Sequence, residues 1–125
     1  HVVCGYNEIK SYENPNNKNI PKVVLNSKDE LIYISRSIIP GSKKKDDNKY
    51  LKQVCIYGFN KKQLYNFAKL KEKSIIEKRE DIEILRFFEL GIKIKMTKLN
   101  SRSIAVDKIN DVKKAENLIL KKYGR

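Results

Sequence analysis

The sequence predicts an α/β or α+β protein built around a mixed sheet. Short runs of apolar and β-branched residues dominate the first half of the chain, and the apolar period changes to that of helices after Gly58. Helices and strands then alternate, which is typical of a sheet covered by helices. With 125 residues, of which 40% are hydrophobic, the chain can form one domain with one modest core.

The first half of the chain is predicted to consist of loops and three strands. Residues 11–21 contain two prolines and four asparagines, a composition typical of a loop. Strands are expected at 22–25 and 31–35, joined by a turn into a hairpin, and a third strand at 50–57. The polar, glycine-containing segment 39–49 is predicted to be a loop.

The second half is predicted to alternate between helices and strands. Helices are expected at 60–70, capped by Asn60, at about 80–90, followed by Gly91 as C-terminal cap, and from Asn110 onward. Strands are expected at 92–96 and 104–106. Helical spacing predicts inward-facing side chains at Leu64, Phe67, Ala68, Leu70, Ile84, Leu85, Phe88, Val112, Ala115 and Ile119.

The charge balance favours a polyanionic partner. Lys and Arg number 28 against 15 Asp and Glu, which gives a formal net charge of +13. The basic residues are spread over nearly every segment, without an RNP-like aromatic stretch, a zinc-finger spacing or a GXXG loop. A small polyanion such as a nucleoside triphosphate therefore fits the charge better than a nucleic acid. The apolar runs are far shorter than the roughly 20 residues that span a bilayer, so we expect a cytoplasmic protein without membrane contact.

The two cysteines, Cys4 and Cys55, each follow a valine in an apolar setting, and there is one histidine. A disulfide framework and a Cys/His zinc site are therefore not expected. Cys55 lies inside a predicted strand without a basic neighbour that would lower its thiol pKa. We interpret it as a core residue and not as a nucleophile.

Three positions could contribute binding chemistry, and each also has a structural explanation. Asp107 would stand at the carboxyl end of a strand, where ligands bind in open α/β sheets, or it could be an ordinary turn residue. Arg36, at the end of another strand, suits a carboxylate or phosphate, and a surface salt bridge explains it equally well. Glu77 could accept hydrogen bonds from a polyol or favour a helix dipole. Spacing alone leaves the function open.

Residues 31–40, LIYISRSIIP, resemble the Tyr-Phe-Ser-Arg-Ser-Pro-Ile-Pro motif of the 3-deoxy-manno-octulosonate (Kdo) cytidylyltransferases, the CMP-Kdo synthetases. Four further stretches are similar to that family in the same order along the chain. They are Asn14-Pro before Lys22-Val-Val, and residues 50–59, 74–86 and 105–112. The likeness spans about residues 14–120 and is specific.

The resemblance implies the C-terminal half of a Rossmann-like, three-layer fold of the nucleotide-diphospho-sugar transferase type with a mixed sheet. Residues 1–21 would form an opening loop segment, and 22–125 the sugar-binding and dimerisation half of a single domain. The implied enzyme couples CTP to a 3-deoxy sugar acid such as Kdo, with Mg²⁺ at the phosphates and pyrophosphate as product. Because the family's CTP-binding segment has no counterpart here, we expect the isolated chain to be inactive. We also expect a homodimer, because the family's C-terminal half supplies much of its dimer contact and a half-domain exposes apolar surface. The alternatives are a non-catalytic dimerising or sugar-binding module and a basic nucleic-acid-binding protein.

The same resemblance implies roles for five residues. Asp107 corresponds to a metal-ligand aspartate, and Arg36 to an arginine that borders the site. Gln53, Tyr57 and Glu77 correspond to positions that line the sugar-acid pocket. Gln53 stands where many members carry His, so it keeps the ability to hydrogen-bond but cannot become positively charged toward the substrate carboxylate.

Overall fold

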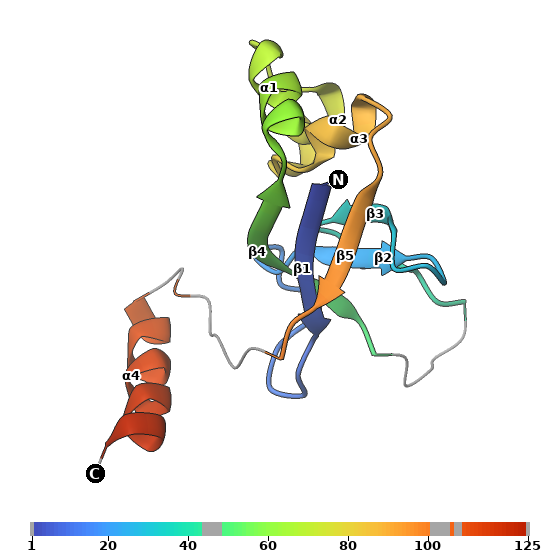
Figure 1. Cartoon of the computed structure of the whole chain (residues 1–125). Coiled ribbons are helices and arrows are strands. Elements are labelled where there is room, and N and C mark those ends of the chain that lie inside the picture. The colour runs from blue at the N-terminus through green and yellow to red at the C-terminus, as the bar shows by residue number, and fades with distance from the viewer. Residues whose placement is uncertain (1, 44–48, 101–105, 107–108, 125) are drawn as a thin grey trace.

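The structure, a computed structural model, describes residues 2–43, 49–100, 106 and 109–124, and its centre is a five-stranded mixed sheet (Figure 1). The order across the sheet is β3-β2-β4-β1-β5, in which β1 and β5 run parallel and the other neighbours antiparallel. The predicted α/β organisation around a mixed sheet is confirmed. The strands are β1 (Val2–Glu8), β2 (Lys22–Leu25), β3 (Leu31–Ser35), β4 (Leu51–Phe59) and β5 (Ile94–Lys98).

Strand β1 corrects the prediction that residues 1–21 form only an opening loop segment. It pairs with β4 on one side and with β5 on the other, so it lies inside the sheet. Val2 and Cys4 are buried in the core. The apolar run at this end is too short to be distinguished from a loop by composition, and its pairing partners lie 43 (51 − 8) and more residues further along the chain.

Three helices lie together at the end of the sheet where β4 ends and β5 begins (Figure 1). They are α1 (Lys61–Lys69), α2 (Ile75–Glu80) and α3 (Leu85–Glu89). Helix α1 begins as predicted, because the Asn60 side chain accepts a hydrogen bond from the Gln63 N–H at 2.9 Å. Its predicted core stripe is only partly correct. Phe67 packs against Phe87, with ring centroids 5.2 Å apart, whereas Leu64 is exposed.

The single helix predicted at about 80–90 is two short helices with a turn between them. A capping box between Ser74 and Glu77 starts α2 earlier than predicted. Asp81 then takes a left-handed conformation with φ 52° and ends α2. The bend allows Ile82 and Ile84, which flank it, to be buried together in the core.

Helix α4 (Ile109–Tyr123) contradicts the prediction of an inward-facing apolar stripe. None of its residues is buried, and Val112 and Ile119 are exposed. Figure 1 shows α4 apart from the sheet, so no element of the described chain covers the apolar stripe of α4. Asn110 lies inside the helix and is not its cap. Of the predicted strand at 104–106, Val106 lies outside any strand, and the other two residues are outside the described part.

The core lies between the sheet and the segment that contains α3. Its fully buried side chains include Ile34 and Ile94 from the sheet and Leu85 and Phe87 from α3. Burial of such side chains stabilises the fold by about 1.5–3 kcal/mol each. None of the helices described here has the length and apolar character needed to cross a membrane.

A buried ion pair joins α2 to α3. The Glu77 side chain has no exposed surface, and its two carboxylate oxygens accept hydrogen bonds from Arg86 Nε and Nη2 at 2.6 and 2.5 Å. The Arg86 guanidinium lies 3.9 Å from the ring centroid of Phe67, so α1 contacts the same pair. The pair therefore holds the three short helices together. Helices of this length are not stable on their own in water and depend on such tertiary contacts.

Candidate functional site

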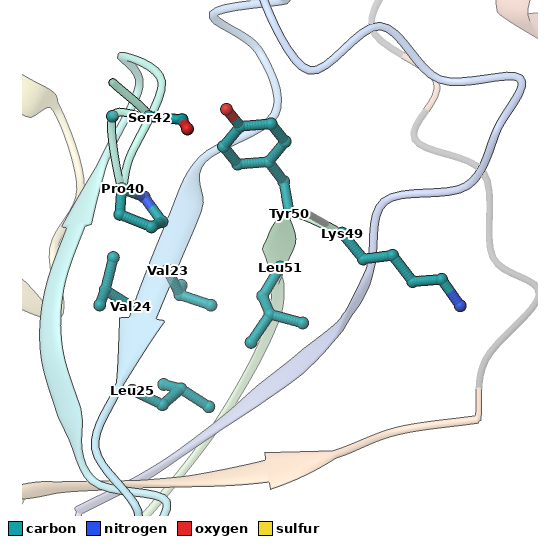
Figure 2. A pocket seen from close by; sticks show the side chains of 9 residues that line it. Val23, Val24, Leu25, Pro40, Ser42, Lys49, Tyr50 and Leu51 are labelled. Carbon is teal, nitrogen blue, oxygen red and sulfur yellow. The ribbon is translucent and has the colours of Figure 1, made fainter. Parts of the chain in front are cut away.

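Two hollows of the described chain have room for a small ligand. The first, of about 300 Å³, lies beside β2 and the start of β4 and is mostly apolar, lined by side chains that include Val23, Val24, Pro40 and Tyr50 (Figure 2). None of the residues predicted to bind substrate lines it. The second, of about 410 Å³, contains three of them and is called the polar hollow here.

The polar hollow brings together Arg36, Gln53 and Tyr57, as the resemblance implies. Gln53 and Tyr57 come from β4, and Arg36 directly follows β3. Further lining residues come from the loop before β2 and from the bend after α2. The loop contributes Asn19 and Pro21, the bend contributes Asp81, Ile82 and Glu83, and β4 contributes Cys55 as well.

A bulge in β4 aligns Gln53 with Tyr57. Cys4 of β1 pairs with Tyr57 and the next residue, Gly5, pairs with Val54, so two residues of β4 at this point have no partner in β1. Such bulges redirect side chains, and they are common beside binding sites. Here Gln53 Nε2 donates to the Tyr57 hydroxyl oxygen at 2.9 Å.

The Tyr57 side chain lines the hollow, and its hydroxyl has a proton to donate there. Its oxygen already accepts from Gln53, and no acceptor for its own proton lies among the residues placed in the structure. Burial of the side chain raises the pKa of Tyr57. The hydroxyl therefore stays protonated through the physiological pH range and can donate to a carboxylate or hydroxyl oxygen.

Arg36 holds the walls of the hollow together. Its guanidinium donates to three backbone carbonyl oxygens: Glu80 at 2.6 Å, Asp81 at 2.9 Å and Lys18 at 3.0 Å. In return the Glu80 carboxylate accepts from the Arg36 N–H at 2.9 Å and from the Ser35 hydroxyl at 2.6 Å. The end of β3 is thus joined to the end of α2 and to the loop before β2. Each of the three guanidinium nitrogens has a protein partner, so Arg36 borders the site chiefly as its framework.

A buried lysine supports the same framework. Lys22 has no exposed surface, and its ammonium donates to the carbonyl oxygens of Arg36 at 2.5 Å and Asn17 at 3.2 Å. Burial, together with the nearby Arg36 charge, lowers the pKa of Lys22. The loop before β2 is therefore fixed at two points, by Lys22 and by Arg36.

Glu77 is not brought into the hollow, contrary to the prediction from the resemblance. Its carboxylate is buried, paired with Arg86 and used in the capping box of α2. The Arg86 guanidinium lowers the pKa of Glu77, which keeps the carboxylate ionised inside the protein. In the described chain Glu77 is a structural residue.

Cys55 is exposed and lines the hollow, so the interpretation of it as a core residue is wrong. The bulge in β4 turns it away from the core, a feature that the residue types around it do not reveal. Cys4 is the buried cysteine, and burial raises its pKa to about 11.

The predicted metal ligand, Asp107, lies outside the described residues. Within the part of the chain that is described, no three His, Cys, Asp or Glu side chains gather in a way that could hold a metal ion.

The fold is a Rossmann-like α/β fold whose sheet, together with the bend after α2, forms a polar hollow. Comparison with known proteins agrees with this class. The family described as cytidylyltransferase matches residues 2–94 of the chain. The chain therefore belongs to the cytidylyltransferase family.

Curated relatives within that family are identical to the chain at about a third of the aligned positions. The 3-deoxy-manno-octulosonate cytidylyltransferase of Flavobacterium johnsoniae is 35% identical over 113 residues, which cover 90% of this chain and 46% of the relative. That of Fusobacterium nucleatum is 34% identical over 119 residues, covering 95% of this chain and 46% of the relative. The chain thus spans about half the length of the curated relatives it matches.

A solved structure matches nearly the whole chain. It is the CMP:2-keto-3-deoxy-manno-octonic acid synthetase complexed with CTP, with a TM-score of 0.84 and 30% identity over 97% of this chain and 49% of that one. The predicted Rossmann-like fold is confirmed by this match. The matches do not support the prediction that the chain corresponds to the C-terminal half of its relatives.

Proposed function

We propose that this chain provides the sugar-acid site of a cytidylyltransferase that couples CTP to 3-deoxy-manno-octulosonate. The observation that supports it best is the polar hollow, in which Tyr57, oriented by Gln53, can donate a hydrogen bond to an acid or hydroxyl oxygen. The names of the relatives point to the same sugar acid, and the structural neighbour was solved with CTP.

The reaction joins the two substrates through one phosphorus atom. The anomeric hydroxyl oxygen of the sugar acid attacks the α-phosphorus of CTP and loses its proton, a new O–P bond forms, and pyrophosphate leaves with the electrons of the broken bond. In this proposal Tyr57 and Gln53 bind and orient the acid, and the framework around Arg36 fixes the shape of the hollow. The net charge of +13 attracts both anionic substrates.

Magnesium, a homodimer and a cytoplasmic location belong to the same proposal. Magnesium rests on Asp107 alone among the predicted site residues, and no step assigned to the described residues depends on it. An alternative function, a sugar-binding module without catalysis, would use the same hollow and the same residues.

We expect Tyr57→Phe to lower the affinity for 3-deoxy-manno-octulosonate about tenfold, because it removes one donor and keeps the ring. Isothermal titration of the sugar acid into the 125-residue chain measures this. Tyr65→Phe, a change at an exposed tyrosine of α1 outside the hollow, is the control and should bind like wild type. Equal affinity in the Tyr57 variant would contradict the role of the hydroxyl, and no binding by the wild-type chain would contradict the proposed site.

We also expect the 125-residue chain to form no CMP-sugar when supplied with CTP, the sugar acid and Mg²⁺. It spans about half the length of the relatives, and among the described residues no three His, Cys, Asp or Glu side chains gather in a way that could hold a metal ion. Chromatographic detection of the CMP-sugar, with a mock purification as control, tests this. Product formed by the pure chain would contradict the expectation and favour a complete active site within it.

A further inference from the structure

Four carboxylates lie in or near the polar hollow, and among the described residues only that of Glu83 has no partner. Asp81 Oδ1 accepts from the Lys73 ammonium at 2.8 Å, and Glu80 is engaged by Ser35 and Arg36. Glu77 is buried against Arg86. For Glu83 no hydrogen bond or ion pair is present within the described chain, so its two oxygens are available to a ligand.

The backbone fixes Glu83 at the wall of the hollow. It lies in the bend between α2 and α3, between Ile82 and Ile84, whose side chains are only 3% and 2% exposed. Because its two neighbours point into the core, the side chain of Glu83 points outward. The backbone is also held by a hydrogen bond, which the Glu83 carbonyl oxygen accepts from the Arg86 N–H at 3.1 Å. A carboxylate held on such a bend loses little backbone freedom on binding, which favours affinity.

Glu83 and Tyr57 are neighbours across this wall. Besides the polar hollow, a smaller apolar hollow of about 90 Å³ lies between β4, α1 and α3, and these two residues line both. The polar hollow therefore presents a hydroxyl donor, Tyr57, beside a free acceptor, Glu83. A polyhydroxylated molecule can satisfy both groups at once, because each of its hydroxyls is both donor and acceptor.

We infer that Glu83 accepts hydrogen bonds from the hydroxyl groups of the substrate and thereby selects a polyhydroxylated acid over a simple one. Like charges repel, so the substrate's own carboxylate must point away from Glu83, and its hydroxyl-bearing carbons toward it. Glu83 thus determines both which acid binds and how it is oriented. The inference rests on the proposed function, since it assigns a role within the same hollow.

The experiment compares two anions on the 125-residue chain and its variants. The ratio of affinities for 3-deoxy-manno-octulosonate and for 2-oxobutanoate, which has no hydroxyl, is measured from ¹H–¹⁵N chemical-shift titrations. Non-specific attraction by the net charge of +13 acts on both anions and largely cancels in the ratio. Glu83→Gln should lower the ratio about tenfold, since a charged acceptor binds a hydroxyl more strongly than an amide. Glu72→Gln is the matched control, because Glu72 is exposed and lies outside the hollow.

The outcomes separate this inference from the proposed function. A wild-type chain that prefers the sugar acid, together with a Glu83→Gln variant that keeps the same ratio, would overturn the role of Glu83 and leave the site itself supported. A wild-type chain without preference would overturn both. An unchanged spectrum away from the hollow shows that the Glu83→Gln variant is folded. If Glu72→Gln lowered the affinity ratio as much as Glu83→Gln does, the inference would be overturned.

Discussion

Glu77→Ala is expected to destabilise the chain by about 3–5 kcal/mol, because it leaves the Arg86 guanidinium without its partner inside the protein. Since domains of this size are stable by roughly 5–15 kcal/mol, this change would remove a large share of the free energy of unfolding. Urea unfolding followed by circular dichroism measures the loss. Ser74→Ala, which removes the capping hydroxyl alone, should cost only about 1 kcal/mol. Equal losses in the two variants would contradict a stabilising role for the ion pair.

The same ion pair predicts a dependence of stability on pH. The Arg86 guanidinium lowers the pKa of Glu77 below its ordinary value of 4.5, so below that pH the unfolded chain binds the proton more readily than the folded one. The stabilisation is complete above pH 4.5 and is lost as the pH falls through the lower folded-state pKa. Glu77→Gln should therefore lose less stability than wild type as the pH falls below 4.5. A parallel acid loss in both proteins would show that other carboxylates cause it.

Arg36→Ala is expected to have the second largest effect, a loss of about 2–3 kcal/mol together with loss of sugar-acid binding. The change removes one cation that donates to three carbonyl oxygens from two separate segments, and hydrogen bonds to charged groups stabilise by about 1.5–3 kcal/mol without adding fully. Both walls of the polar hollow would lose their common support. Denaturant unfolding and titration of the same variant give the two quantities.

Two further variants make the Arg36 prediction specific. Arg36→Lys keeps the charge, but an ammonium cannot reproduce the planar fork, so its stability should lie between those of wild type and Arg36→Ala. Arg79→Ala removes the same charge from an exposed position on α2 and should change neither stability nor binding by a measurable amount. If Arg36→Ala were as stable as Arg79→Ala but bound no sugar acid, Arg36 would be a direct ligand and not the framework.

The sequence allowed four of the five described strands, all but β1, and three members of the polar hollow to be predicted. Strands β2 and β3 were predicted with their observed bounds, since apolar runs bounded by turn residues are a local signal. Arg36, Gln53 and Tyr57 were found by resemblance to a family, because a family motif can identify a binding residue even where the spacing of residues does not indicate a function. The structure adds how they act together, through the Gln53–Tyr57 hydrogen bond and the carbonyl contacts of Arg36.

The errors have physical causes that residue types do not encode. Glu77 was predicted to line the pocket, but the Arg86 that neutralises it is nine residues away, and only the turn at Asp81 brings them together. Cys55 was assigned to the core because a strand was assumed to be regular, and the bulge exposes it. Glu83 could not be predicted at the hollow, because the break between α2 and α3 that places it there depends on tertiary burial of its neighbours.

The place of β1 in the sheet has a consequence for synthesis of the chain. Of the five strands, β1 leaves the ribosome first, yet its partner β5 is about 90 residues further along, which corresponds to on the order of 10 s of translation. During this interval β1 can pair with β4 at most, and the edge meant for β5 stays open to other chains. A nascent chain stopped before Ile94 should therefore depend on chaperones and aggregate without them. A chain that includes β5 through Lys98 can complete the sheet by pairing β5 with β1.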